Sequence, residues 1–236
     1  MEAFAEKTKE ISEIYINATE SEADGIYVFS TDEKMGVQAR EHKNPSISMK
    51  EGCPEKIDPE YIRHGTSGII ASRNVATGEI VAPMVQPTRT EEDFAQHIEN
   101  VINGCFSWRR LVFIVDNLNT HKSEALVRLV AKIEGIPESE LGVKDRKGIL
   151  KSQVTREMFL NDPSHSIQFV YTPIHCSWLN QIECWFGIIT RRLLNRRASF
   201  LSVSDLEQKI MAFIDYYNQY LKKPFLWNYK GKLLKV

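Results

Sequence analysis

The sequence predicts an α/β fold in which a mixed sheet, a three-strand meander plus parallel strands, carries helices on both faces. Two continuous apolar runs, LVFIV at 111–115 and IQFVY at 167–171, are typical of strands buried on both faces. An earlier strand and a hairpin supply the meander. Segments with helical apolar spacing alternate with the two apolar runs, so helices are expected to cover the sheet.

The first quarter of the chain is expected to form a helix and the first meander strand. Residues 1–24 read as a polar N-terminal helix or a linker remnant. GIYVFS at 25–30 predicts a strand that stops at the polar residues after it, and 41–66, rich in Pro, Gly and charge, predicts a long loop. Residues 68–85 then predict two strands joined by a turn, which complete the meander.

The remaining elements alternate between helix and strand. Thr90, with an acid three residues later, opens a helix with a capping box. A second amphipathic helix is expected at 122–133, and two more close the chain at 178–195 and 204–221. The polar segment 134–165 holds at most one helical turn. This order of elements is that of a ribonuclease H-like fold.

Composition excludes several classes of protein. A hydrophobic content of 42% and a charged content of 26% are ordinary for a folded protein. The four cysteines form no CxxC pair, which argues against a structural zinc site and favours reduced thiols. No secretory signal is visible, and no apolar run approaches the roughly 18 residues that span a bilayer. We therefore expect a soluble, cytoplasmic protein.

Charge is distributed unevenly, although the formal net charge is only −1. Residues 1–24 carry seven acids against two lysines. Residues 184–236 carry ten Lys or Arg against three acids, a local balance of +7. This excess predicts an anionic partner for the C-terminal third, while a solvated charged face is the alternative explanation.

Two acids stand at the ends of predicted strands. Asp32 follows the first strand, and Asp116 ends the run at 111–115. Sites in open α/β sheets form outside the carboxyl ends of strands, so both acids are expected at one edge if the two strands are neighbours. Turn or cap residues are the alternative for each.

A third acid, Glu183, lies in an apolar helix that finishes in a block of positive charge. The stretch is HCSWLNQIECWFGIITRRLLNRR at 175–197, and Glu183 borders its core stripe. Gly187, one turn further on, has no side chain to crowd the carboxylate. A glycine inside a helix costs about 1 kcal/mol relative to alanine, so close approach by another group is indicated. A boundary Glu of an amphipathic helix is the alternative.

Three carboxylates from separate elements, without a Cys or His cluster, suit Mg²⁺ or Mn²⁺ better than zinc. Two such ions about 3.5–4 Å apart can serve phosphodiester chemistry. Four arginines beyond Glu183 are positioned to hold a phosphate backbone that leads to the metals: Arg191, Arg192, Arg196 and Arg197.

Several motifs, found together and in this order, resemble the catalytic domain of DDE transposases, most closely the bacterial insertion-sequence branch of the mariner superfamily. The likeness covers residues 25 to 234. The motifs are STDEKMGVQAR (30–40), HGTSGIIASRNVATGEIVAP (64–83), PTRTEEDF (87–94), FIVDNLNTHKSEALVRLV (113–130), YTPIHCSWLNQIECWF (171–186) and FIDYYNQYLKKPFLWNYKGKLL (213–234).

The resemblance implies a ribonuclease H-like catalytic domain over 25–236, with an insertion at about 134–165. It also implies that Asp32, Asp116 and Glu183 bind two Mg²⁺ or Mn²⁺ ions. The expected chemistry is hydrolytic cleavage at transposon terminal inverted repeats and attack of the freed 3′-hydroxyl on TA-containing target DNA. The implied setting is a homodimer on DNA in a bacterial, nucleoid-associated location.

Further residues in these motifs are candidates for supporting roles. Lys122 joins the four arginines as a candidate DNA contact. Residues expected to support the acids or to face DNA are Asn117, His121, His175 and Asn180. A structural histidine remains the alternative for each of the two histidines.

The resemblance leaves rivals and departures. Glu33 rivals Asp32, while Glu157 and Asp162 in the long interval between the second and third acids rival Glu183. Full-length relatives carry helix-turn-helix domains before the catalytic domain, so a fragment, a truncated reading frame or dependence on another protein are the alternatives. A non-catalytic DNA-binding remnant and a ribonuclease H-like nuclease are the competing functions.

Overall fold

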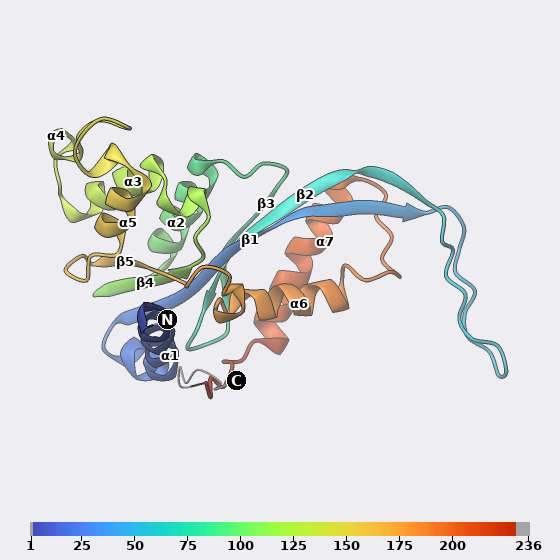
Figure 1. Ribbon diagram of the computed structural model, residues 1–236. Helices are drawn as coiled ribbons and strands as arrows, with labels where there is room; N and C mark the ends of the chain where they lie inside the picture. Colours follow the sequence, from blue (N-terminus) through green and yellow to red (C-terminus); the bar gives the residue numbers. More distant parts are fainter. Residues whose placement is uncertain (1, 230–236) are drawn as a thin grey trace.

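The computed structural model describes residues 2–229 and contains a five-stranded sheet with the strand order β3-β2-β1-β4-β5 (Figure 1). The strands β1, β4 and β5 are parallel, whereas β2 is antiparallel to both β1 and β3. The mixed sheet and the ribonuclease H-like arrangement are therefore confirmed. The strands are β1 (Ile26–His42), β2 (Tyr61–Asn74), β3 (Ile80–Gln86), β4 (Arg110–Val115) and β5 (Ile167–Tyr171).

Strand β1 is much longer than expected. It runs on past the predicted stop, and Asp32, opposite Ala71 of β2, lies inside the strand rather than after it. Pairing with β2 supplies ladder partners that the polar sequence does not reveal. Beyond the body of the sheet the two strands continue as a curved two-stranded ribbon (Figure 1), and residues 43–60 connect them. The predicted loop at 41–66 is therefore shorter than its sequence suggested.

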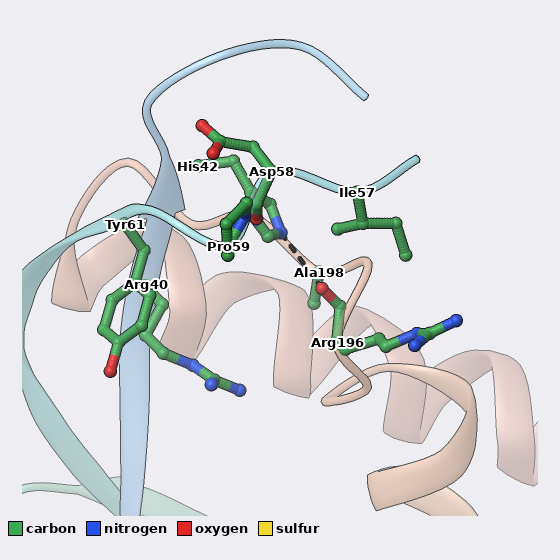
Figure 2. A pocket seen from close by; sticks show the side chains of 8 residues that line it. All are labelled: Arg40, His42, Ile57, Asp58, Pro59, Tyr61, Arg196 and Ala198. Carbon is green, nitrogen blue, oxygen red and sulfur yellow. Dashed lines mark hydrogen bonds between the residues drawn. The ribbon is translucent and has the colours of Figure 1, made fainter. Parts of the chain in front are cut away.

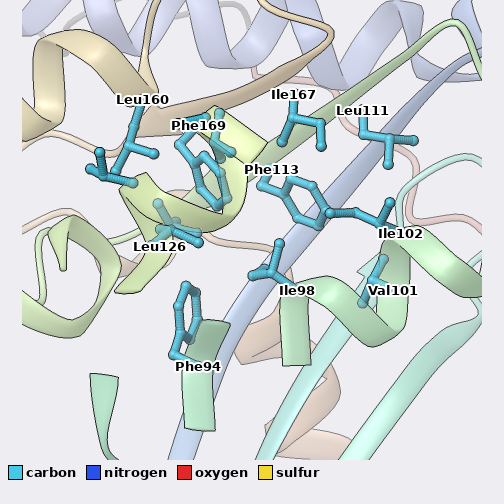
Figure 3. Close-up of a cluster of buried hydrophobic side chains, with 14 of the residues drawn as sticks. Phe94, Ile98, Val101, Ile102, Leu111, Phe113, Leu126, Leu160, Ile167 and Phe169 are labelled. Carbon is cyan, nitrogen blue, oxygen red and sulfur yellow. The ribbon is translucent and has the colours of Figure 1, made fainter. Parts of the chain in front are cut away.

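One face of the sheet is covered by three helices that enclose a core of aromatic and branched side chains (Figure 3). Phe29, Phe113 and Phe169 stack in a row across β1, β4 and β5. The predicted capping box is present at Thr90. These helices are α2 (Glu91–Gly104), α3 (Glu124–Glu134) and α5 (Gln153–Leu160).

The opposite face is covered by α1 (Glu2–Ala23), α6 (Ile182–Arg192) and α7 (Val203–Tyr216), the last continuing as a π-helical turn, η4 (Tyr217–Leu221) (Figure 1). Helix α1 buries Ile11, Tyr15 and Ala18 against the sheet. Helices α6 and α7 pack on β1 and β2. Helices therefore lie on both faces of the sheet, as expected.

The remaining short elements revise two expectations. The segment 134–165 holds α4 (Glu138–Leu141) and the 3-10 turn η2 (Ile149–Lys151) besides α5. A 3-10 turn, η1 (Asn119–Lys122), precedes α3, and another, η3 (Ser177–Leu179), precedes α6. Helix α6 therefore begins at Ile182 instead of 178, because the side chains of Asn180 and Gln181 form hydrogen bonds with residues of β1 and β2. Among residues 2–229, no helix is long and apolar enough to cross a bilayer.

Candidate metal and nucleic-acid site

The backbone brings Asp32 and Asp116 to equivalent positions on neighbouring parallel strands. Ser30 of β1 is in register with Ile114 of β4, and each acid follows its strand partner by two residues. Neighbouring strands lie about 4.8 Å apart, and residues two apart share a face. The two carboxylates therefore stand side by side on the face that carries α1 and α6, as the sequence predicted.

Asp32 is nearly buried, at 5% exposure. Its Oδ1 accepts a hydrogen bond from the Glu33 amide at 2.8 Å, and its Oδ2 accepts one from Asn180 Nδ2 at 3.3 Å. Burial, together with the charge of Asp116, raises the pKa of Asp32 to about 8. The Asp32 carboxylate is therefore costly to ionise, and a cation beside it would stabilise its charged form, which fits a divalent metal ion.

His121 joins Asp116 to Glu33. Its Nδ1 lies 2.8 Å from Asp116 Oδ1, and its Nε2 lies 3.0 Å from Glu33 Oε2. Burial alone would lower the pKa of the imidazole, but the hydrogen bonds and charges of the two carboxylates raise it to about 10. The ring is therefore a buried imidazolium at neutral pH, and it is packed against Phe94 with ring centroids 4.3 Å apart.

The imidazolium also acts on its partners. Burial raises the pKa of Asp116 and Glu33, but the hydrogen bond and charge of His121 outweigh that effect and hold both below their usual values. Asp116 Oδ1 is further occupied by the amide of Leu118 at 2.9 Å. Within residues 2–229, Asp116 Oδ2 has no hydrogen-bond partner, so it is the oxygen available to a metal ion.

One group of possible ligands, Asp32, Glu33 and His121, has its ligand atoms within 4.8 Å of one another in the described part of the chain. His121 uses both nitrogens as donors to carboxylates, which leaves no lone pair for a metal. Glu33 has a fully buried side chain held by that imidazolium. The chemistry of the group therefore favours Asp32 as the ligand and assigns Glu33 and His121 to its support.

Asn180 and Gln181 fix the start of α6 to the sheet. Asn180 accepts from Ser30 Oγ and donates to the carbonyl of Thr31 at 3.0 Å. Gln181 Oε1 accepts from Arg73 Nη1 at 2.9 Å. Both side chains are buried, so the polar pair inside the motif SWLNQIE docks the turn before α6 onto β1 and β2.

Two residues that sequence reasoning missed support the same turn. The hydroxyl of Tyr15 in α1 donates to the carbonyl of Leu179 at 2.8 Å and accepts from the Gln181 amide at 3.3 Å. Arg73 is fully buried, donates to the carbonyl of Lys223 at 2.8 Å, and lies 3.7 Å from the ring centroid of Phe225. An apolar neighbourhood on both sides of Arg73 in SGIIASRNV was the one signal that could have marked it as buried.

Glu183 stands in the first turn of α6 and is exposed. Its amide donates to the carbonyl of Asn180 at 3.1 Å, which puts it one turn beyond the residue that contacts Asp32. The carboxylates of Asp32, Asp116 and Glu183 do not all lie within 4.8 Å of one another in the described chain. Glu183 is the one acid of α6, and its exposed side chain forms no hydrogen bond or ion pair within residues 2–229.

Gly187 serves a different group from the one expected. The guanidinium of Arg191 lies over it, so the cleared space holds an arginine rather than the Glu183 carboxylate. Arg192 ends α6, and Arg196 and Arg197 lie in the following loop rather than on the helix. Arg197 pairs with Glu55 at 2.7 Å. Arg191, Arg192 and Arg196 remain exposed and carry no ion pair within residues 2–229.

Lys122 and Asn117 belong to an internal network. The ammonium group of Lys122 is mostly buried, donates to Asn117 Oδ1 at 2.8 Å and to Glu157 Oε2 at 2.6 Å, and lies over the ring of Tyr171. Asn117 donates to the carbonyl of Thr172. These bonds hold the loop after β4 to the loop after β5, and they leave the exposed arginines as the stronger candidates for DNA contact.

The rivals for the third ligand have other partners. Glu157 is bound to Lys122, and Asp162 Oδ1 accepts from the amide and hydroxyl of Ser164 at 2.8 and 2.7 Å. His175 is exposed, has φ +63°, and lines a cavity of about 460 Å³ that also contains Asp116. It contacts neither carboxylate of the pair through any hydrogen bond within residues 2–229, so it faces the space beside the site.

Comparison with known proteins places the chain among DNA-processing enzymes. The sequence profile of the family described as DDE superfamily endonuclease matches residues 27–207. No curated protein sequence matches the chain. Solved structures with the same fold include structures of Mos1 transposase.

The catalytic domain of Mos1 mariner transposase aligns with a TM-score of 0.53 at 11% identity, covering 98% of this chain and 87% of that one. The Mos1 mariner paired-end complex with Mn aligns with a TM-score of 0.53 at 13% sequence identity, covering 98% of this chain and 59% of that one. The Mos1 strand transfer complex aligns with a TM-score of 0.53 at 14% sequence identity, covering 100% of this chain and 64% of that one. This chain thus spans about three-fifths of the length of the transposase chains in those complexes. At these identities the likeness establishes the fold.

Proposed function

This chain belongs to the DDE superfamily of endonucleases, and we propose that it is the catalytic part of a transposase that cuts the ends of a mobile DNA element and joins them to target DNA. One observation carries the proposal: Asp32 and Asp116 stand at matched positions on adjacent parallel strands, and burial and mutual repulsion raise the pKa of Asp32. Solved structures of similar fold that are described as a paired-end complex and a strand transfer complex support it.

Asp32, Asp116 and Glu183 are the residues we propose to hold two Mg²⁺ or Mn²⁺ ions. When bound, such ions supply an activated attacking oxygen and stabilise the leaving oxygen in phosphodiester chemistry. The chain itself supplies orientation. Asn180 holds the Asp32 carboxylate, while His121 and the Leu118 amide occupy Asp116 Oδ1 and leave Oδ2 for an ion. Second contacts of this kind fix ligand geometry.

The exposed arginines at the end of α6 and in the loop after it are the proposed contacts to the DNA backbone, because phosphate binding needs cations that are not already paired. Arg191, folded back over Gly187, is the member directed toward the turn that carries Glu183. The proposed substrates are terminal inverted repeats and a TA-containing target, and the proposed assembly on paired ends is a homodimer.

The proposal is tested with the inverted repeats that flank the coding sequence in its genome. Asp116→Asn and Glu183→Gln should each reduce Mn²⁺-dependent cleavage by at least about 10³-fold, because each removes a proposed metal ligand, while DNA binding stays within about threefold. Asp162→Asn is the matched control, since Asp162 caps a turn on the surface. Full cleavage by Glu183→Gln would remove Glu183 from the site.

Metal binding gives a readout that needs no DNA. Titration calorimetry with Mn²⁺ should give two ions per wild-type chain and a large loss of affinity in Asp116→Asn. Absence of Mn²⁺ binding together with salt-sensitive DNA binding would favour a non-catalytic DNA-binding remnant. Cleavage without joined strands would favour a ribonuclease H-like nuclease.

A further inference from the structure

A basic groove lies where the β1–β2 ribbon leaves the body of the protein (Figure 2). It encloses about 270 Å³ and draws its walls from four segments: the outer part of β1, the connection 43–60, the start of β2, and the loop between α6 and α7. We call it the arm groove and define it by Arg40, His42, Asp58, Tyr61 and Arg196. It is distinct from the carboxylate site, which lies further back along β1.

The walls of the arm groove are tied together by specific bonds. The two ring nitrogens of His42 lie 3.2 Å from the carbonyl oxygen of Asp58 and 3.0 Å from that of Arg196. The amide of Phe200 donates to the carbonyl of Arg40 at 2.8 Å. The loop that carries Arg196 is therefore anchored to β1, so the groove is a built feature and not a chance gap between mobile segments.

The arm groove contains two arginines, Arg40 and Arg196, and one acid, Asp58. Arg40 and Arg196 form no ion pair with any carboxylate in the described residues. The one acid in the wall, Asp58, uses its carboxylate to accept from the amide and side chain of Asn44 and from the amide of Glu60. Two guanidinium groups without an acidic partner can bind phosphate groups through charge-assisted hydrogen bonds.

Tyr61 adds to this arrangement without cancelling the charge. Two guanidinium groups lie near its ring, with Arg40 Cζ at 5.6 Å and Arg63 Cζ at 5.4 Å from the centroid. The ring holds Arg40 at the wall by a cation–π contact.

We propose that the arm groove binds the sugar–phosphate backbone of DNA at two separate phosphates, one on Arg40 and one on Arg196. Figure 2 shows the two guanidinium groups well apart, as separate contacts require. The proposal rests on the function proposed above and deepens it by giving the DNA a second anchor away from the cut.

The position of the groove predicts where on the DNA this anchor falls. Arg40 follows Asp32 by eight residues along β1, and a strand rises about 3.3 Å per residue, which gives roughly 26 Å. Phosphates on one strand of B-DNA are spaced by about 3.4 Å along the axis. DNA that runs along the ribbon from the carboxylate site therefore meets the groove about eight base pairs from the scissile phosphate.

The experiment combines protein variants with uncharged phosphates in the DNA. The full-length chain, as wild type, Arg40→Gln and Arg196→Gln, is titrated with terminal-repeat DNA over a range of salt. Each variant should lose about tenfold in affinity and should lower the slope of log K against log salt by about 0.9, the value for one phosphate. Arg109→Gln is the matched control, an exposed arginine directly before β4 at the amino end of the parallel strands, and it should change neither quantity.

A single methylphosphonate is then moved along each strand. A methylphosphonate about eight base pairs from the cut should weaken DNA binding by the wild type but should not weaken DNA binding by Arg40→Gln any further. Equal losses in wild type and variant at every position would overturn the proposal. A second outcome would also overturn the proposal. If inorganic phosphate raises the melting temperature of the wild type but not of Arg40→Gln, and DNA affinity is the same for both, the ligand is a free anion.

The two proposals fail in different ways. If the chain is not a DNA-cleaving enzyme, Asp116→Asn leaves cleavage unchanged or no cleavage exists to measure. If only the arm groove is wrong, wild type cuts DNA in a metal-dependent manner and both groove variants match Arg109→Gln in affinity and salt slope. Circular dichroism melts of all variants guard against misfolding, and Arg40→Lys, which keeps the charge, should restore the salt slope.

Discussion

The guanidinium group of Arg191 lies over Gly187, with Nη1 3.1 Å from the point where a β-carbon at residue 187 would stand. Long side chains in helices lean back toward the N-terminus, so Arg191 is directed toward the turn of α6 that carries Glu183. A glycine in the middle of a helix costs stability. A glycine at position 187 is explained because it leaves room for the guanidinium group of Arg191 next to the proposed metal site.

Replacing that glycine should separate stability from activity. Gly187→Ala should raise the free energy of unfolding by about 0.5–1 kcal/mol, because alanine is the better helix former and Arg191 can swing outward. Cleavage should fall about tenfold, since the arginine loses its position. Urea denaturation and single-turnover cleavage check the two effects, with Arg191→Ala as the companion variant. If the double variant loses much more than either single one, the two residues act independently and the explanation fails.

Metal affinity should depend on pH through Asp32. Its pKa is raised to about 8, so below that pH an entering ion must displace a proton. The apparent Kd for Mn²⁺ should therefore fall about tenfold per pH unit up to about pH 8 and level off above it. Calorimetry between about pH 6 and 8.5 measures this slope. Asp32→Asn should bind weakly and without the slope; a wild-type affinity independent of pH would contradict the assignment.

His121 should be essential to stability near neutral pH. His121→Gln leaves Glu33 buried without its cation, and breaking a buried ion pair costs about 3–5 kcal/mol. The pKa of His121 is raised to about 10, above the usual 6.5, so its stabilising contribution is complete below about pH 6.5 and is lost as pH rises toward 10. Urea midpoints of wild type should fall over that range, and those of His121→Gln should stay flatter. His64→Gln, on the exposed ribbon, is the control.

Asn180 should couple the start of α6 to the carboxylate pair. Asn180→Leu keeps the branching and the number of side-chain heavy atoms but removes partners from Ser30, from the Thr31 carbonyl and from Asp32. Leaving buried polar groups unpaired should cost about 1–3 kcal/mol and reduce cleavage further than the loss of folded protein explains. Cleavage measured well below the melting temperature isolates the second effect; normal cleavage there would show that the contact is only structural.

Local patterns in the sequence predicted much of the fold. The apolar runs at 111–115 and 167–171 gave β4 and β5, because a strand buried on both faces needs apolar residues throughout. The capping box at Thr90 marked the start of α2, because its hydrogen bonds close within three residues. The length of β1 was not predictable, since its outer half is polar and depends on pairing with β2.

In the candidate site, too, the sequence predicted individual residues but not the contacts between distant segments. Asp32 and Asp116 could be found because Asp32 follows the short apolar run at 25–30 and Asp116 ends the run at 111–115, although β1 continues past Asp32. The bonds from His121 to Glu33 and from Arg73 to Gln181 could not be deduced, because the bonded residues are 88 and 108 residues apart, and the bond from His121 to Asp116 depends on the turn that follows β4. The later start of α6 was hidden for the same reason, since strand contacts of Asn180 compete with helix formation.

By itself, the sequence predicted the order of elements and the excess of positive charge near the C-terminus, because each depends on residue type and short-range spacing, and with the family resemblance it nominated Asp32, Asp116 and Glu183 as candidate ligands. Only the tertiary structure decided that Asp32 and Asp116 are neighbours, that the imidazolium of His121 supports one of them, and that Gly187 makes room for Arg191. These features depend on strand order, burial and side-chain direction, which arise when distant segments pack together.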